Sequence, residues 1–225
     1  MRLLWLDPIG TDAYRQPTLR LLRAACRADT DIDFVSLAQG RPLDLEDPAS
    51  EAIVAPDIVA IAGSAGAAYD GILIGCFFDT ALPEARAVAG GCIVTGPCEA
   101  TTQAASQTAG RFSILVGSDS WVPRLRRKLE AYGTGNRLAS IRSAGLSVAQ
   151  LGEPSLSTLD ALARAGREAV DEDGADMLIV GCTADTTSRN ALELQLRVPV
   201  LDSVVAPFIW LEDQVRARKV TLANA

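Results

Sequence analysis

The chain has 225 residues, 48% of them hydrophobic, so it can bury a core as one large domain or two small ones. Its 21 basic and 28 acidic residues give a net charge of −7, which argues against a nucleic-acid or anionic-membrane partner. It has no histidine, which excludes Ser-His-Asp and Cys-His nucleophile pairs and most transition-metal sites.

The apolar runs are short. Residues 3–6 end at Asp7-Pro8, too soon for a signal peptide, and residues 204–211 contain Pro207 and cannot span a bilayer. Five cysteines without framework spacing argue against a disulfide scaffold. We therefore expect a soluble cytoplasmic protein with no membrane partner.

In the first half of the chain, strands are expected to alternate with helices. The expected strands are 2–6, 32–37, the run before Gly75, and 92–95; the expected helices are about 16–28, 56–68 and 80–90. Pro56 is favoured in the first turn of a helix, and Gly90-Gly91 is typical of a helix C-terminus.

The second half of the chain repeats this alternation. The expected strands are 111–116, 138–142, the run before Gly181, and 199–201. Two expected helices end near residues 108 and 196, and three others cover about 122–132, 156–171 and 204–219. Residues 143–154 are the least regular stretch, which we interpret as a flap or a crossover. The alternation predicts an α/β fold with parallel sheets.

One motif occurs twice, as residues 70–80 and 176–186. Its cysteines, Cys76 and Cys182, lie 106 residues apart, and Asp, Gly, Cys, Asp and Thr match without a gap. Each copy is typical of a buried parallel strand that ends in Gly-Cys, followed by a polar pair suited to starting a helix. Because chemistry gathers at the carboxyl ends of such strands, both thiols are candidate catalytic groups.

The duplication extends beyond the motif. Residues 2–6 and 111–115 each open one half, and Val94 precedes Val200 by 106 residues. We infer two similar parallel-sheet lobes related by a pseudo-twofold axis, with the active-site cleft between them and one thiol on each wall. The N-terminal lobe with its closing helix is expected to comprise residues 1–96 plus 204–225, and the second α/β lobe residues 97–203.

Two opposed thiols suit the inversion of a carbon centre, which needs a base on one face and an acid on the other. A thiol pKa near 8.5 lets either group take or give a proton. A helix N-terminus directly after each cysteine would favour the thiolate. Backbone N–H groups around Phe77-Phe78 and Thr183-Ala184 could hold the oxygens of an enolate.

Simpler structural roles compete with these functional ones. Cys26 and Cys92 are expected to be small hydrophobes, and so, less strongly, is Cys98. Phe77 and Phe78 are divided about evenly between core and pocket lining. Helix capping is the leading interpretation for four polar residues that follow the cysteines, which are Asp79, Thr80, Asp185 and Thr186.

These motifs have a familiar pattern. The segments Gly75–Asp79, Glu99-Ala100, Gly110–Ser113 and Gly181-Cys182 resemble the Asp/Glu/hydantoin racemase superfamily, and within it the hydantoin and allantoin racemases. The resemblance covers nearly the whole chain. It implies a two-lobed α/β fold that commonly forms homo-oligomers.

The resemblance also implies a chemistry. It implies racemisation of a small molecule without cofactor or metal, with Cys76 and Cys182 as catalytic residues. The residues expected to bind substrate lie at strand tips and in the turns after the cysteines: Asp7, Pro8, Gly10, Thr11, Phe77, Phe78, Glu99, Ser118, Thr183 and Ala184.

Two segments differ from the hydantoin racemase pattern. Residues 7–11 read Asp-Pro-Ile-Gly-Thr where that branch usually has Asn-Pro-Asn-Thr, and Gly-Cys-Thr-Ala-Asp replaces Gly-Cys-Ala-Gly-Met at the second cysteine. Asp7 could act like the N-terminal aspartate of the amino-acid racemases. Amino-acid racemisation, with Thr11, Ser118 and Thr183 binding a carboxylate, therefore stays an alternative to a hydantoin or allantoin-like substrate.

Other functions also stay open. Decarboxylases and cis-trans isomerases share the fold; the second thiol argues against a decarboxylase, while an isomerase could use one thiol as a nucleophile. A non-catalytic, intracellular two-lobed binding protein is the alternative outside the enzymes, and it would leave the matched thiols without a purpose.

Overall fold

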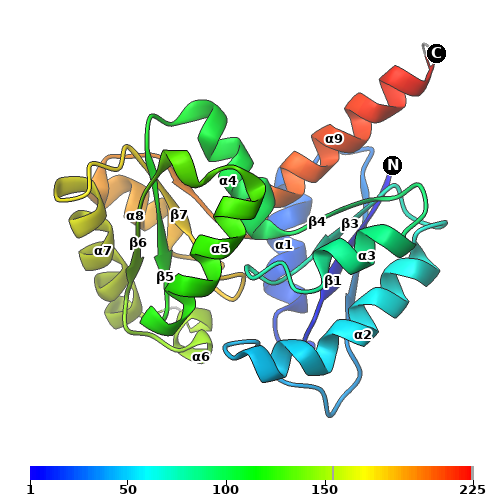
Figure 1. The fold of residues 1–225 in the computed structure, drawn as a ribbon, viewed down its shortest axis with the longest axis horizontal. Coiled ribbons are helices and arrows are strands. Elements are labelled where there is room, and N and C mark those ends of the chain that lie inside the picture. The colour runs from blue at the N-terminus through cyan, green and yellow to red at the C-terminus, as the bar shows by residue number, and fades with distance from the viewer. Residues whose placement is uncertain (154, 224–225) are drawn as a thin grey trace. The chain divides into compact units, whose positions relative to one another are not determined.

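The computed structural model describes residues 1–153 and 155–223. The chain divides into two compact units, which we call unit 1 and unit 2. Unit 1 comprises Met1–Ala100 and the C-terminal segment from Val204, and unit 2 comprises Thr101–Ser203. Each unit contains one four-stranded sheet whose strand pairings are all parallel (Figure 1), so the expected α/β class is confirmed.

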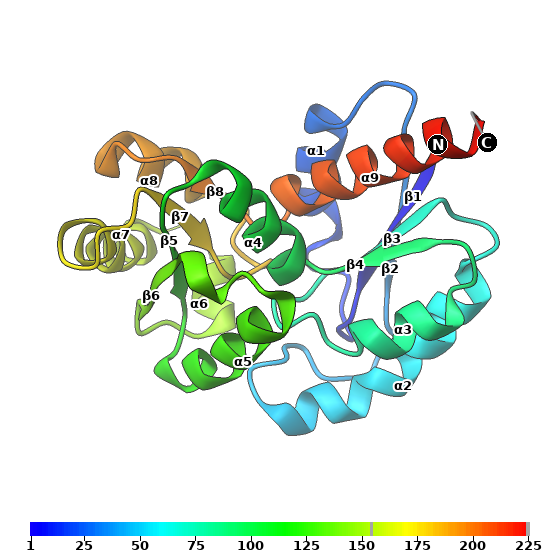
Figure 2. The same cartoon turned by 45° about the horizontal axis from the view of Figure 1, so that its top comes forward.

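Unit 1 has a sheet with helices on both faces. Its strands are β1 (Arg2–Asp7), β2 (Asp31–Ser36), β3 (Gly71–Ile74) and β4 (Ile93–Thr95), in the order β2-β1-β3-β4. Helices α1 (Arg15–Ala25) and α9 (Val205–Ala223) cover one face, and α2 (Pro48–Ala65) and α3 (Leu82–Val88) cover the other (Figure 2).

Unit 2 repeats this plan. Its strands are β5 (Phe112–Val116), β6 (Leu138–Ser143), β7 (Met177–Val180) and β8 (Val200–Leu201), in the order β6-β5-β7-β8. Its helices are α4 (Pro97–Thr108), which begins in unit 1, α5 (Val122–Tyr132), α6 (Val148–Gly152), α7 (Leu156–Asp171) and α8 (Arg189–Leu196). Short 3₁₀ turns lie at Asp119–Trp121 and Gly135–Arg137.

The two sheets also share a register. Leu3 is paired with Gly71 in unit 1, and Phe112 is paired with Met177 in unit 2. Past the strand ends, the N–H of Gly75 donates to the Leu6 carbonyl at 2.7 Å, and the N–H of Gly181 donates to the Leu115 carbonyl at 2.8 Å. The sequence repeat is therefore a repeat of backbone structure, and it fixes Cys76 and Cys182 at equivalent positions.

An aspartate anchors the start of the first strand in each unit. The backbone N–H of Arg2 donates to Asp70 at 2.8 Å, and that of Arg111 donates to Asp176 at 3.1 Å. Each aspartate directly precedes its Gly-Cys strand, which explains why Asp opens both copies of the motif. Each carboxylate satisfies a backbone N–H group at the start of a central strand of its sheet.

The core of unit 1 depends on the last helix of the chain. Trp5 stacks on Phe34 with ring centroids 6.4 Å apart and lies 6.3 Å from Phe208 of α9. Leu211 of the same helix is fully buried and packs with Leu3 in this cluster. Burying an aromatic or leucine side chain contributes about 1.5–3 kcal/mol, so α9 supplies a large part of the stability of unit 1.

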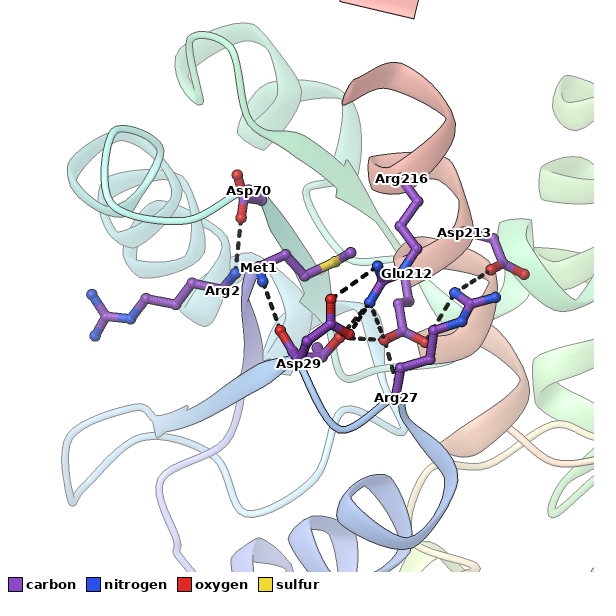
Figure 3. Close-up of polar contacts among 9 residues, drawn as sticks. Met1, Arg2, Arg27, Asp29, Asp70, Glu212, Asp213 and Arg216 are labelled. Carbon is purple, nitrogen blue, oxygen red and sulfur yellow. Dashed lines mark hydrogen bonds and ion pairs between the residues drawn. The ribbon is translucent and has the colours of Figure 1, made fainter. Parts of the chain in front are cut away.

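A buried carboxylate fastens α9 to the connection between α1 and β2 (Figure 3). Glu212, whose side chain is 2% exposed, accepts hydrogen bonds from the Arg27 N–H at 3.2 Å and from the Thr30 hydroxyl. The guanidinium groups of Arg27 and Arg216 each lie 3.6 Å from one of its oxygens. These partners offset the desolvation of the charge.

Some expected helix boundaries are wrong. Helix α2 begins at Pro48 rather than near Pro56, because the Asp47 side chain accepts from the N–H groups of Ala49 and Ser50 at 2.8 and 2.9 Å. That cap outweighs the proline signal, and Pro56 lies inside the helix. The closing helix extends to Ala223, beyond the expected 219.

The stretch interpreted as a flap or crossover contains a helix. Within residues 143–153, α6 has a capping box in which Ser147 and Gln150 bind each other's backbone N–H. Pro154 of that stretch, and residues 224–225 of the expected closing segment, lie outside the described residues. Among the described helices, none has the length and apolarity needed to cross a bilayer.

Candidate active site

The first thiol lies in a tight turn directly after β3. The N–H of Cys76 donates to the Ile74 carbonyl at 2.8 Å, and the Cys76 carbonyl accepts from the N–H of Asp79 at 2.9 Å. Only glycine fits before the cysteine, because a Cβ on Gly75 would come within 2.5 Å of Nε1 of Trp5. The turn leaves Cys76 9% exposed.

Neither cysteine lies at the N-terminus of the helix that follows it. Helix α3 begins at Leu82 and α8 at Arg189, six and seven residues after Cys76 and Cys182. In the first copy, Asp79 and Ala81 adopt left-handed backbone angles, with φ of 48° and 54°, which delays the helix. The expectation that the dipole of the next helix activates each thiol is therefore wrong.

Asp79 caps a helix, but not the one expected. Its buried carboxylate accepts from the N–H groups of Cys98 at 3.0 Å and Glu99 at 2.8 Å, in the first turn of α4. Gly96 permits this approach, since a Cβ there would collide with the carboxylate. The turn after Cys76 is thus fixed to the turn after β4.

Thr80 does not cap a helix. Its hydroxyl lies 3.7 Å from Sγ of Cys76 and 2.8 Å from Oε2 of Glu51, in the first turn of α2. The Thr80 side chain is buried, and Glu51 is partly exposed. Sequence reasoning missed Glu51, because nothing in the chain signals that the start of α2 reaches the turn after β3.

Asp7 ends β1, next to the strand that precedes Cys76. It is 5% exposed, and within the described residues its Oδ2 has no hydrogen-bond partner. Burial raises the pKa of Asp7 well above its ordinary value; Asp12 adds to the rise, and Arg15 opposes it. A buried carboxyl with an unsatisfied oxygen is typical of functional sites.

The other expected substrate contacts of unit 1 lie near these groups. Pro8 and Gly10 are buried, and the Gly10 N–H donates to the Pro42 carbonyl at 2.8 Å. Thr11 is partly exposed. Phe77 and Phe78, in the turn after the thiol, are 4% and 5% exposed, which favours packing over an open position.

Glu99 is engaged by the protein itself. It forms an ion pair with Arg86 and accepts from the Thr95 hydroxyl at 3.0 Å. Arg86 also donates to the Val94 carbonyl at 2.8 Å. Arg189 repeats that bond in unit 2, to the Val200 carbonyl at 2.9 Å, so the arginine belongs to the repeated frame.

Unit 2 carries the second thiol and the remaining expected contacts. Cys182 and Ala184 are both 6% exposed, and Thr183 and Ser118 are partly exposed. Asp185 accepts from the N–H groups of Thr187 and Ser188, both at 2.9 Å, so it caps the turn before α8. Thr186 is partly exposed.

The three cysteines outside the repeat have other surroundings. Cys98 is fully buried in the first turn of α4. Burial raises the pKa of Cys26 to about 12, with Glu212 adding to the rise, and that of Cys92 to about 11, with Asp70 adding to it. Since the thiolate is the reactive form, Cys26 and Cys92 fit the structural role expected of them.

Comparisons with known proteins agree on one family. A model described as "Asp/Glu/Hydantoin racemase" matches residues 3–207. A hydantoin racemase of Pseudomonas sp. (strain NS671) is 30% identical over 226 residues, which cover 98% of this chain and 88% of that protein. The structure of an allantoin racemase from Klebsiella pneumoniae has a TM-score of 0.88 at 26% identity, covering 96% of this chain and 88% of that one.

A further solved structure shares the fold at lower similarity. Arylmalonate decarboxylase has a TM-score of 0.62 at 16% identity, covering 96% of this chain and 92% of that one. At that identity the likeness concerns the fold alone.

Proposed function

The chain belongs to the Asp/Glu/hydantoin racemase family, and on that premise we propose that it inverts a carbon centre next to a carbonyl by proton transfer between two thiols. Family membership confirms the resemblance drawn from the motifs and supports racemase activity on a small molecule. The observation that carries the proposal is that Cys76 and Cys182 occupy equivalent positions. Each follows a glycine whose N–H donates to the equivalent carbonyl in the first strand of its own unit.

The proposed reaction needs no group beyond the two sulfurs. One thiolate removes the proton from the carbon, so that a C–H bond breaks and an S–H bond forms. The resulting enolate is planar, and the other thiol returns a proton to its opposite face, leaving a thiolate. The proposal requires the two sulfurs to act on opposite faces of one carbon. Backbone N–H groups in the turns after the cysteines would hold the enolate oxygens.

We propose a 5-substituted hydantoin or an allantoin-like ring as the substrate. Two observations on relatives support this choice: the hydantoin racemase of Pseudomonas sp. and the allantoin racemase of Klebsiella pneumoniae both align over nearly the whole chain. The carbon between a ring carbonyl and a ring nitrogen is acidic enough for a thiolate to deprotonate. We also propose that the protein acts in the cytoplasm as a homo-oligomer.

Asp7 fits the edge of such a ring. Burial raises the pKa of Asp7, and in its protonated form the carboxyl would offer one O–H donor and one C=O acceptor, the same pair that an asparagine amide offers. A hydantoin presents a complementary pair, a ring N–H beside a carbonyl. In our proposal Asp7 therefore takes the place of the asparagine that hydantoin racemases usually carry after the first strand.

The proposal is tested with single cysteine variants. Racemisation of enantiopure 5-substituted hydantoins is followed by polarimetry, with the rate without protein subtracted, and exchange of the carbon-bound hydrogen is followed in D2O. Cys76→Ser and Cys182→Ser are each expected to lower racemisation by about 10²–10⁴-fold. Each should retain exchange from one enantiomer only, because one face still has its base.

Cys92→Ser is the matched control, because its thiol has a pKa raised to about 11 and lies outside the repeat. It should retain full activity. Full racemisation by either repeat-cysteine variant would contradict the two-thiol reaction. Allantoin, aspartate, glutamate and an arylmalonate complete the substrate panel; turnover of an amino acid alone would move the substrate to the amino-acid branch, and release of CO2 would replace racemisation by decarboxylation.

A further inference from the structure

The hydroxyl of Thr80 has two neighbours and one hydrogen. It lies 2.8 Å from Oε2 of Glu51 and 3.7 Å from Sγ of Cys76. It can donate to only one of them at a time, and its lone pairs are open to the other. The state of Glu51 is thereby linked to the state of the Cys76 sulfur.

An ionised Glu51 accepts the Thr80 hydrogen in preference to the Cys76 sulfur. A hydrogen bond to a carboxylate is shorter and about twice as strong as one between neutral groups, which agrees with 2.8 Å to Glu51 against 3.7 Å to sulfur. With its hydrogen turned to Glu51, Thr80 presents lone pairs to Cys76. The protonated sulfur can donate to these lone pairs, whereas a thiolate would be repelled by them.

We propose that Glu51, acting through the Thr80 hydroxyl, holds Cys76 in its protonated form and so makes Cys76 the resting acid of the two proposed thiols. This inference rests on the two-thiol reaction proposed above. Glu51 and Thr80 are positioning residues, since neither has to touch the substrate. In the resting protein the base would then be Cys182.

The repeat makes this arrangement specific to unit 1. Glu51 is the fourth residue of α2, and the fourth residue of the corresponding helix α7 is Leu159. The first turn of α7 contains no acidic residue. Thr186, which matches Thr80 in the motif, is partly exposed where Thr80 is buried. The glutamate beside Thr80 is therefore not repeated in the first turn of α7.

Other charged groups surround Cys76 on the elements packed around it. Asp7 ends β1, Asp79 lies in the same turn with its carboxylate on the start of α4, and the Arg86–Glu99 pair joins α3 to α4. The Thr80 hydroxyl links Glu51 to Cys76.

The test measures the apparent pKa of Cys76 directly. The rate of iodoacetamide alkylation is followed from pH 6 to 10, with each cysteine peptide quantified by mass spectrometry. In Glu51→Gln the negative charge is gone and the side-chain amide N–H can donate to the Thr80 oxygen, so the Thr80 hydrogen can turn to sulfur. The apparent pKa of Cys76 should fall by about one unit, and alkylation below that pKa should become about threefold faster.

Three variants separate this linkage from other effects. Asp57→Asn removes a carboxylate from the same helix, where it pairs with Arg41, and should leave the Cys76 profile unchanged. Thr80→Val should reduce the effect of Glu51→Gln, and Thr80→Ser should restore it. The profile of Cys182 should not move in any of these variants.

An unchanged or raised Cys76 pKa in Glu51→Gln would overturn the inference, as would an equal shift in Asp57→Asn. Because alkylation reports on the sulfur alone, this result is independent of racemisation. Loss of racemisation in Cys76→Ser with no shift in Glu51→Gln would leave the two-thiol reaction standing without the linkage.

Discussion

Unit 1 and unit 2 have the same backbone arrangement, but some of the side chains near Cys76 differ from those at the equivalent positions in unit 2. Leu6 and Leu115 are equivalent, and the next residue ends the first strand in each unit. That residue is Asp7 in unit 1 and the fully buried Val116 in unit 2. The Thr80–Glu51 contact likewise belongs to unit 1. The comparison teaches that the repeat supplies the frame and the cysteine twice, while Asp7 and the Thr80–Glu51 contact belong to unit 1.

The largest expected contrast separates the repeated cysteines from two of the others. With a pKa raised to about 12 and about 11, Cys26 and Cys92 should be alkylated by iodoacetamide at pH 8 about 60-fold and about 20-fold more slowly than an ordinary exposed thiol. Peptide mass spectrometry measures each rate. If Cys26 or Cys92 reacted first, and ligand protected it, the assignment of Cys76 and Cys182 as the working thiols would fail.

The aspartates three residues after each cysteine should differ in their effect on stability. Asp79→Ala removes a buried carboxylate that fixes the start of α4 and should cost about 3 kcal/mol of unfolding free energy. Asp185→Ala removes a cap within its own turn and should cost about 1 kcal/mol. Urea unfolding of the two variants measures both costs; equal costs would show that the two turns are held alike.

A pH-dependent effect concerns Asp7, for which unit 2 has no titrating counterpart at Val116. Because folding raises the pKa of Asp7, the unfolded chain ionises first: stability is intact below the unfolded pKa of about 3.9 and falls as pH rises toward the folded pKa. Each unit by which folding raises the pKa of Asp7 lowers the unfolding free energy at high pH by about 1.4 kcal/mol. Asp7→Asn should remove this decline.

Urea unfolding of wild type and Asp7→Asn from pH 4 to 8 tests this directly. The unfolding free energy of the variant should gain on that of wild type as pH rises. Parallel curves would mean that the Asp7 carboxyl is ionised in the folded protein and does not act as a neutral donor.

The sequence predicts the frame better than the site. The α/β class, the parallel sheets and the equivalence of Cys76 with Cys182 follow from hydrophobic runs and an ungapped repeat, which are local signals. The contact of Glu51 with Thr80 joins residues 29 positions apart and depends on where α2 begins. Asp47, rather than Pro56, decides that start, so the proline signal conceals the contact.

The turn after Cys76 shows the same limit. Capping preferences predict that Asp79 caps the next helix, but its left-handed backbone turns the carboxylate toward α4 instead. Such preferences describe neighbours along the chain. They do not indicate that a strand two elements later brings another helix start within reach.

Helix α9 is translated after the strands of both units, yet it completes the unit whose strands are made before those of the other. Until Phe208 and Leu211 emerge, the face of the first sheet that carries Trp5 has α1 but lacks the second of its two covering helices. All strands of Thr101–Ser203 have been made by then, so that unit can close earlier. Maturation during synthesis therefore runs against the order of translation, and the nascent N-terminal sheet is the stage at which chaperone binding would matter most.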